Sequence, residues 1–291
     1  MDDMRMKKKT DRLITAETEI PLYADDGADR ALVRAIEEIV KKDAVYKSEI
    51  SSDTGPDSGS RTASKTGPGA GTDPNRGFYL WIGREGVSLV EGETALQGDF
   101  RKSLQRLTPE NLNRELLVRA AKIKGCKAEE MTVADATAGM GDDSLLLAAA
   151  GFRVQMYERN PVIAALLYDA LRRASEEPEL ASAAERMRLH TGDSIALLPQ
   201  LTPAPDIVLL DPMFPGRKKT GLSKKKLQLL QQLEQPCEQE EELLNAAAAC
   251  GPQKIVIKRP LKGTYLAGRK PGFSIRGKLI RYDCIVFPRK S

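Results

Sequence analysis

The chain has 291 residues, 41% hydrophobic and 30% charged, with a formal net charge of +4. No apolar run approaches the roughly 18 residues that a membrane-spanning helix needs, and the first residues, MDDMRMKKKTDRL, lack the apolar segment of a secretory signal. Four scattered cysteines without a CxxC pair and a single histidine, His190, exclude a conventional zinc site and a Ser-His-Asp triad. We therefore expect a reduced, cytoplasmic protein without a metal and away from membranes.

The net charge hides an asymmetry between two parts of the chain. From Pro212 to Ser291 there are 17 Lys and Arg against 6 Asp and Glu, whereas the first 211 residues carry 28 against 35. A lysine run by itself is usually a solvated face, but these cations begin directly after an Asp-Pro motif. The pattern favours a polyanionic partner.

Residues 1–107 are predicted to form a small α/β region. Apolar residues at helical spacing predict a helix over Asp29–Lys42. Residues 48–77 are rich in Ser, Gly, Thr, Pro and Asp, so we expect a disordered insertion there. The stretches GFYLWIG and GVSLVEG then predict a hairpin whose turn is marked by Gly83 and Gly86.

Residues 108–291 are predicted to form a second domain. Thr108 as N-cap and Pro109 at the first helical position indicate a helix that ends at Gly125. Strands and helices then alternate. The strands are expected at 131–137, 153–159, 186–193, 206–212, 254–260, 274–278 and 279–288, and the helices at 141–151, 160–174, 223–236 and 239–251. This alternation predicts an α/β fold with a mostly parallel, doubly wound sheet, whose ligands bind at the carboxyl ends of the strands.

The first motif, DATAGMGDD, follows the first strand of this alternation. Its two glycines allow a tight turn, and the next helix offers its N-terminal amides to a ligand. Ser144 stands where the third glycine of a dinucleotide fingerprint belongs. Carboxylates here would repel a pyrophosphate but suit a sulfonium and an ammonium group. We therefore predict S-adenosylmethionine rather than NAD, with cofactor-binding candidates Asp135, Gly139, Gly141, Asp142 and Asp143.

Two more carboxylates follow the next two strands. Glu158 in YERN could accept hydrogen bonds from both ribose hydroxyls, although a surface glutamate near the next helix is an equal alternative when it is taken alone. Asp193 in HTGDS ends the following strand, where an adenine amino group could find an acceptor. His190 lies inside that strand, and we interpret it as structural.

The stretch VLLDPMFPGRKK places Asp211 at the end of a strand and Pro212 in the turn behind it. A carboxylate and the carbonyls of such a turn can accept both hydrogens of an exocyclic amine, while Phe214 stacks on its base. Orienting a poorly nucleophilic amine toward a methyl donor is a way to accelerate its methylation. We predict Asp211, Pro212 and Phe214 as catalytic residues; the alternative is a proline-rich turn that only closes a strand.

The motifs DATAGMGDD, YERNPVIAALLYDAL, LLDPMFPGRKK and IVIKRP resemble those of the bacterial small-subunit ribosomal RNA guanine-N2 methyltransferase family. The resemblance extends from Arg114 to Pro288. It implies a Rossmann-like, seven-stranded class I methyltransferase fold, and activity on a guanosine of 16S rRNA. It also implies cofactor contacts at Asp142, Asp143, Glu158, Arg159, Gly192, Asp193 and Asp211. Family members usually have Arg-Asp in place of Asp142-Asp143, and Ser-Ser in place of Gly192-Asp193.

The expected substrate is thus 16S rRNA or the small ribosomal subunit. The cations predicted to hold its phosphates are Arg217, Lys218, Lys219, Lys224, Lys225, Lys226, Lys258 and Arg259. Two other functions stay open. One is methyl transfer to a different NH2 group, adenine N6 or protein glutamine, since the Asp-Pro-x-Phe turn resembles those enzymes too. The other is a non-catalytic, RNA-binding assembly factor. The sequence does not determine the oligomeric state.

Overall fold

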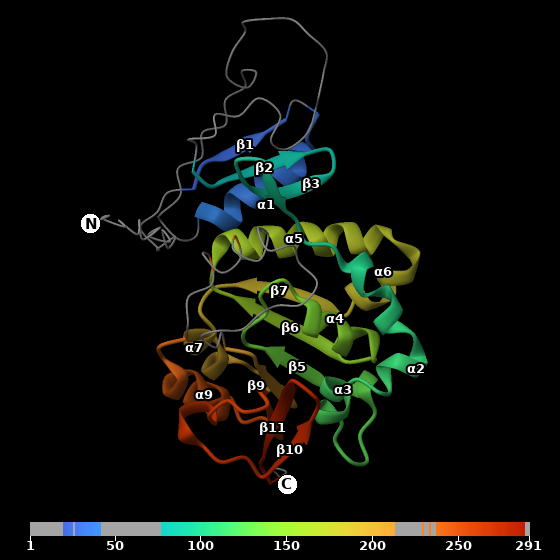
Figure 1. Ribbon diagram of the computed structural model, residues 1–291, viewed down its shortest axis with the longest axis vertical. Coiled ribbons are helices and arrows are strands. Elements are labelled where there is room, and N and C mark those ends of the chain that lie inside the picture. Colours follow the sequence, from blue (N-terminus) through green and yellow to red (C-terminus); the bar gives the residue numbers. More distant parts are fainter. Residues whose placement is uncertain are drawn as a thin grey trace, which may run out of the picture.

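The computed structural model describes residues 20–25, 27–41, 77–212, 229, 233 and 237–288. Figure 1 shows a small sheet with one helix at one end of the molecule, a long helix beneath it, and a larger sheet that extends to the opposite end. In these residues no helix is long and apolar enough to cross a membrane.

The larger sheet has seven strands in the order β10-β11-β9-β8-β5-β6-β7. The five consecutive strands β9, β8, β5, β6 and β7 are parallel, whereas β11 runs antiparallel to β9 and β10 antiparallel to β11. The chain moves from β5 outward to β7 and then returns to β8 on the other side of β5, so the order reverses between β5 and β8. This confirms the predicted doubly wound, mostly parallel sheet. Its strands are β5 (Thr132–Asp135), β6 (Arg153–Glu158), β7 (Met187–Thr191), β8 (Ile207–Leu210), β9 (Lys254–Pro260), β10 (Phe273–Arg276) and β11 (Ile280–Val286).

Helices cover both faces of this sheet. Val133 and Ile207 pack against one helical layer, while their neighbours Ala134 and Val208 pack against the other. Burial on both faces explains why the strands are nearly continuous apolar runs. The first layer contains α3 (Leu116–Ala121), α4 (Asp142–Ala149), α5 (Pro161–Glu176) and α6 (Pro178–Ala184). The second contains α7 (Ser194–Leu197) and α9 (Glu240–Ala249), with the short turns η3 (Leu198–Gln200) and η4 (Leu266–Gly268).

Helix α5 begins as predicted, because the Asn160 side chain accepts hydrogen bonds from the amides of Val162 and Ile163. The helix is apolar on two sides. Leu167 packs against the large sheet, whereas Leu166 packs against the small one. Helix α5 therefore joins the two sheets.

The small sheet has the order β1-β2-β3-β4, and the predicted hairpin is confirmed with Gly83 opposite Gly86. Its strands are β1 (Leu22–Ala24), β2 (Tyr79–Gly83), β3 (Gly86–Glu91) and β4 (Thr94–Leu96), and its helix is α1 (Arg30–Lys41). Leu229 and Leu233, from far along the chain, are buried in the same core. The predicted insertion at 48–77 lies outside the described residues except for Gly77. The domain boundary at residue 108 stays a prediction.

The predicted single helix from Thr108 to Gly125 is wrong. The chain forms η1 (Phe100–Leu107), a single turn α2 (Pro109–Leu112), and then α3. Between α2 and α3, Glu115 has an extended backbone (ψ 125°), and its carboxylate accepts two hydrogen bonds from Arg106, at 2.8 and 3.0 Å. The Asn111 side chain bonds the Gln105 carbonyl (2.7 Å). Asparagines bond to nearby backbone in this way and so disfavour a continuous helix. A short turn η2 (Ala128–Glu130) then precedes β5.

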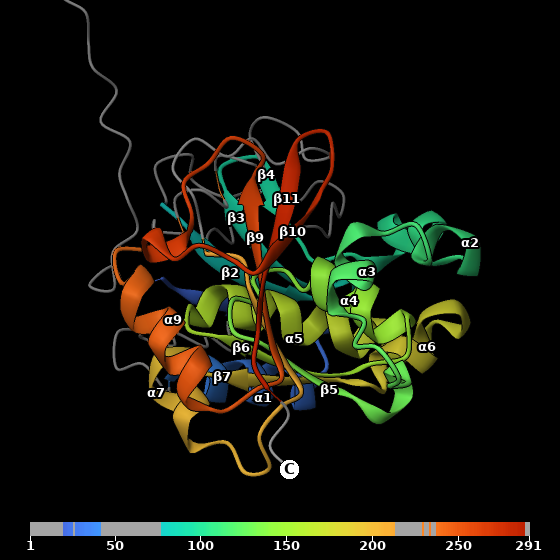
Figure 2. The same cartoon turned by 90° about the horizontal axis from the view of Figure 1, so that it is seen from below.

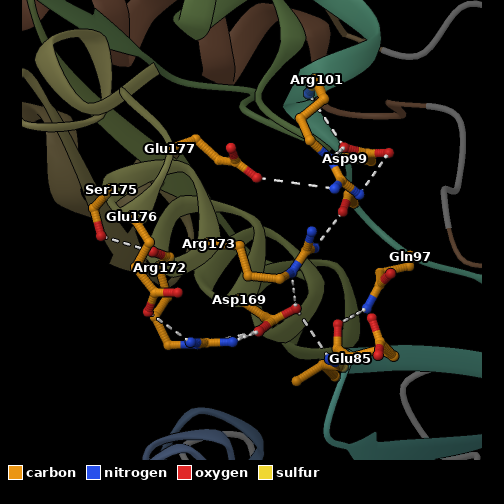
Figure 3. A network of polar contacts seen from close by, with 12 residues as sticks. Glu85, Gln97, Asp99, Arg101, Asp169, Arg172, Arg173, Ser175, Glu176 and Glu177 are labelled. Carbon is orange, nitrogen blue, oxygen red and sulfur yellow. Dashed lines mark hydrogen bonds and ion pairs between the residues drawn. The ribbon is translucent and has the colours of Figure 1, made fainter. Parts of the chain in front are cut away.

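A buried group of charges fastens α5 to the small sheet. We call Asp169, Arg172 and Arg173 the junction cluster. Figure 3 shows the Asp169 carboxylate between the two arginines. Asp169 is completely buried, accepts from Arg173 Nε at 2.9 Å and Arg172 Nη2 at 3.1 Å, and also accepts from the Val87 amide of β3 at 3.0 Å. Gly86 beside it has φ 105°, and a Cβ there would lie 2.2 Å from an Asp169 oxygen. The charges thus hold this junction in one geometry.

Candidate active site

The carboxyl ends of β5, β6, β7 and β8 are tied together by hydrogen bonds between their loops. The Ala138 amide bonds the Tyr157 carbonyl (3.1 Å), and the Gly192 amide bonds the Glu158 carbonyl (2.9 Å). On the other side of β5, the Asp211 amide donates to Thr137 Oγ1 at 2.6 Å. The motifs that the sequence placed at separate strand ends therefore form one site. Thr137 is a member that the sequence analysis missed, although it lies inside DATAG.

The glycine turn after β5 has the geometry that its motif predicts. Gly139 (φ 54°) and Gly141 (φ 80°) are left-handed, and α4 begins directly after Gly141. A Cβ on Gly141 would lie 2.7 Å from a Leu167 methyl carbon and 3.0 Å from the Phe100 ring. A larger residue is thus excluded twice, by backbone conformation and by packing. The turn brings the first amides of α4 to the edge of the sheet.

Glu158 is buried at the end of β6 and forms a hydrogen bond with the glycine turn. Its carboxylate accepts from the Gly139 amide (2.8 Å) and from the Asn160 amide (2.7 Å). The alternative, a glutamate on a solvated surface, does not fit a side chain that is 8% exposed. The neighbouring Arg159 is exposed.

Asp135 lies beneath the turn rather than at its surface. It is 2% exposed, and it accepts from Ser144 Oγ at 2.6 Å and from the Thr137 amide at 3.1 Å. Burial raises the pKa of Asp135 to about 7, against the opposing effect of these hydrogen bonds. Ser144, which stands in place of the third glycine of the fingerprint, therefore donates a hydrogen bond from its hydroxyl to the buried Asp135 carboxylate. Asp135 in turn accepts from the Thr137 amide, so its position is suited to stabilising the glycine turn.

A second group of charges joins three elements at the same edge. We call Asp143, Asp211 and Lys258 the strand-end cluster. The Lys258 ammonium, at the end of β9, forms ion pairs with Asp143 of α4 and with Asp211 after β8, the latter at 3.2 Å. The three side chains are 13–18% exposed. Burial raises the pKa of Tyr282, which lies opposite Lys258 on β11, and the Asp143 charge adds to the shift.

The structure changes the roles of the two cations predicted on β9. Lys258 faces the two carboxylates of the strand-end cluster, so its ammonium is not directed at a phosphate on the surface. Arg259 is 1% exposed; its guanidinium pairs with Glu240 (3.0 Å) and donates to the Thr264 carbonyl (3.0 Å). Because successive residues of a strand point to opposite faces, two adjacent cations could not share one surface. The phosphate role predicted for Arg259 is not compatible with this burial.

The other predicted residues lie at the rim of the site or outside the described residues. Asp193 caps α7 by accepting from the Ile195 amide (2.9 Å), and Gly192 before it has φ 136°. Asp142 is exposed at the start of α4, and Pro212 is buried behind Asp211. Phe214 and the cations Arg217, Lys218, Lys219, Lys224, Lys225 and Lys226 lie outside the described residues.

His190 has structural contacts, as its place inside a strand suggests. Its Nε2 is 2.7 Å from Gln155 Oε1, and its ring stacks on Tyr157 with the centroids 5.0 Å apart. Both partners belong to the adjacent strand β6. These contacts, at the edge of the sheet, support the interpretation of His190 as structural.

Comparison with known proteins agrees with this geometry. Residues 69–287 match the SAM_MT family, described as SAM-dependent methyltransferases. The chain belongs to this family. Two relatives, both named ribosomal RNA small subunit methyltransferase J, are those of Thioalkalivibrio sulfidiphilus (43% identity, 75% of this chain and 88% of that protein) and Alkalilimnicola ehrlichii (40%, 71% and 81%). The crystal structure of a SAM-dependent methyltransferase from Neisseria gonorrhoeae aligns with a TM-score of 0.68 at 28% identity, over 91% of this chain and 95% of that one.

The cofactor of this family member is S-adenosylmethionine. The residues at the strand ends fit it, because the described site offers more carboxylates than cations and the cofactor carries a sulfonium and an ammonium group. The fold prediction is likewise confirmed, since the topology of the large sheet matches that of the class I methyltransferase neighbour.

Proposed function

We propose that this protein methylates the exocyclic N2 of a guanosine in 16S ribosomal RNA. The names of the relatives support small-subunit ribosomal RNA as the substrate. The observation that carries the choice of an amine is the placement of Asp211. Its backbone is held by Thr137 and its carboxylate by Lys258, at the point where the strand order reverses. The small ribosomal subunit as partner and a cytoplasmic location complete the proposal.

We assign the two sides of the cofactor to different acids. Glu158 accepts hydrogen bonds from the ribose hydroxyls, with Arg159, Gly192 and Asp193 around the base. The amides of the glycine turn, together with Asp142 and Asp143, take the charged amino-acid part. Asp135 and Ser144 support the turn from below. S-adenosylmethionine supplies an electrophilic methyl group on its sulfonium.

Asp211 holds the acceptor amine. The N2 lone pair of guanine is delocalised into the ring, so this amine is a weak nucleophile. A carboxylate that accepts an N–H turns the lone pair toward the methyl carbon and stabilises the positive charge that develops on nitrogen. With S-adenosylmethionine bound, the N–C bond would form as the S–C bond breaks, S-adenosylhomocysteine would leave, and the proton that nitrogen loses would pass to the Asp211 carboxylate or to water. The ion pair with Lys258, at 3.2 Å, holds the Asp211 carboxylate in place for this task.

The direct test uses tritiated S-adenosylmethionine with purified protein and 30S subunits or rRNA from a strain without this gene. Digestion to nucleosides and chromatography identify the product. We expect label in N2-methylguanosine. Label in N6-methyladenosine or in protein glutamine would replace guanine by the corresponding acceptor. Cofactor binding with no label in any substrate would favour the non-catalytic, RNA-binding alternative.

The Asp211→Asn variant tests the catalytic residue. Removing one electrostatic contact to a developing charge costs about 10²–10³ in kcat, and we expect a loss of that size with little change in cofactor affinity. The matched control is Glu130→Gln, an exposed carboxylate in η2 at the opposite edge of the sheet. Full activity of Asp211→Asn would contradict the assignment.

A further inference from the structure

A long segment after β9 contains cations and no acids. Residues 261–280 hold five Lys and Arg and no Asp or Glu. All five side chains are exposed: Lys262, Arg269, Lys270, Arg276 and Lys278. The sequence analysis assigned phosphate contacts to 217–226 and to β9, and it passed over this segment. A group of exposed cations in a segment that contains no acids attracts a polyanion.

Two buried arginines determine the shape of this segment. Arg281 is 4% exposed and donates to the carbonyls of Pro260 (2.8 Å), Leu261 (2.8 Å) and Gly263 (3.0 Å), while Asp283 balances its charge. Arg259 holds the Thr264 carbonyl. A buried charge of this kind is retained only with its partners in place. The side chains of Arg281 and Arg259 thus bind the backbone carbonyls of the loop after β9. The cations of the loop itself face solvent.

The segment reaches the same edge of the sheet as the strand-end cluster. Ile280 pairs with Pro260 at the end of β9, and the Leu261 amide bonds the Leu279 carbonyl at 2.9 Å. The turn between β10 and β11 therefore lies beside the first residues after β9. In Figure 2 this hairpin stands next to β9. Three of the five cations, Lys262, Arg276 and Lys278, belong to this edge, two to four residues from the β9–β11 pairing that includes Lys258.

A polar hollow adjoins the hairpin turn. A Cβ on Gly277 would lie 2.6 Å from Leu116 of α3, so the turn and this helix touch. Leu116 also lines a cavity of about 400 Å³ with Gln105, Arg106, Asn111, Arg114 and Glu115. Arg106 donates two hydrogen bonds to the Glu115 carboxylate in this hollow, and these bonds raise the pKa of Arg106. Arg114 is exposed here and adds another cation.

We propose that Lys262, Arg276 and Lys278, with Arg114 beside them, form a docking surface for the RNA phosphates that flank the target nucleotide. This inference rests on the proposed function. We call these four residues the edge surface. Phosphates follow each other along an RNA strand, and a row of cations at the rim would fix the strand while the base enters the site. A base inside folded RNA must be splayed out to be reached, and contacts to its flanking phosphates offset that cost.

The test compares two triple charge reversals. The first is Lys262→Glu, Arg276→Glu and Lys278→Glu, at the edge surface. The control is Lys124→Glu, Lys127→Glu and Arg153→Glu, three exposed cations before β5 and at the start of β6, at the opposite edge. Both variants change the net charge equally. RNA affinity is measured by filter binding over a range of salt concentrations, and steady-state kinetics give KM for RNA and kcat.

We expect the edge variant to raise KM and Kd for RNA at least tenfold, with cofactor affinity unchanged. Its slope of log K against log salt should fall by about 2, because each lost phosphate contact removes about 0.7–0.9 from the slope. The control variant should change Kd less than threefold. Equal weakening of RNA binding in both variants would overturn the proposal, because the effect would then come from net charge alone. Unchanged RNA binding by the edge variant would also overturn it.

Failure of the proposed function gives a different result. If the substrate is not RNA, wild-type protein shows no RNA methylation, and neither variant alters methylation of the true substrate. Binding measured with the Asp211→Asn protein separates docking from chemistry, because that variant keeps the edge surface. A further double variant, Arg269→Glu and Lys270→Glu, changes the two cations of the segment that precede β10 and are not part of the edge surface. It should weaken binding less than the edge variant does.

Discussion

The junction cluster and the strand-end cluster are both groups of three charges, but they differ in burial and in the sign of their net charge. In the junction cluster one acid meets two arginines and a backbone amide, and Asp169 has no exposed surface. In the strand-end cluster two acids share one lysine, and all three side chains keep 13–18% of their surface in contact with solvent. The first cluster carries an excess of positive charge and the second an excess of negative charge.

The difference separates a structural role from a binding role. Asp169 has several donors around it and lies where no ligand can enter. The strand-end cluster has a net negative charge at the carboxyl ends of the strands, where we propose that the amines of the cofactor and of the base bind. Composition alone would not distinguish the two groups. Their burial and the sign of their net charge do.

The largest expected effect comes from breaking the junction cluster. Asp169→Ala leaves two arginines and the Val87 amide without their acceptor, and removing one member of a buried ion pair costs about 3–5 kcal/mol. We expect a loss of that size in the free energy of unfolding, measured with urea. The control is Glu176→Ala, which removes an exposed partner of Arg172 and should change stability little. A stable Asp169→Ala protein would show that the small sheet is held by apolar packing alone.

A second test concerns Asp135, which is buried like Asp169 but whose hydrogen-bond donors among the described residues are a hydroxyl and an amide. Its pKa is raised to about 7 from 3.8. Between these values the folded state holds a proton that the unfolded state has released, so the contribution of Asp135 to stability is most favourable at low pH and falls as pH rises toward 7. The fall attributable to Asp135 is on the order of 4 kcal/mol. Asp135→Asn should remove this component, measured as the difference between urea titrations of the two proteins from pH 4 to 8. Parallel pH profiles would contradict the prediction.

The strand-end cluster is tested through its only described cation. Lys258→Met removes the ammonium that pairs with both Asp143 and Asp211, so this ion pair no longer fixes the position of the Asp211 carboxylate. We expect kcat to fall about 10–100-fold at neutral pH because the acceptor amine is then less well oriented. Lys258→Arg keeps the charge and should restore most of the lost activity. An unchanged kcat in Lys258→Met would mean that the lysine only packs.

The smallest expected effect concerns the hydrogen bond that aligns Asp211. Thr137→Val removes the acceptor of the Asp211 amide, and a single such bond contributes about 1 kcal/mol. Activity should therefore fall about fivefold, with cofactor affinity retained. Thr137→Ser keeps the hydroxyl and should behave like the wild type. Equal losses in both variants would trace the effect to the methyl group instead.

Local patterns were sufficient for much of the fold. The Asn160-Pro161 pair predicted the start of α5, the two glycines predicted the hairpin, and the strand–helix alternation predicted the parallel sheet. These features depend on backbone conformation and on residues close in sequence. The glycine turn was predictable for the same reason. The helix expected at 108–125 failed because a contact between Arg106 and Glu115 competed with helix propensity.

The sequence by itself determined that this protein is an α/β chain with acids at its strand ends, since residue type and spacing specify strands, turns and caps. Only the tertiary structure decided which charges meet. It buried Arg259 against Glu240, placed Lys258 between two acids, and used α5 to join two sheets. The reason is physical. The position of a lysine or arginine head group depends on which strands lie side by side, and strand order is set by packing between residues far apart in the chain.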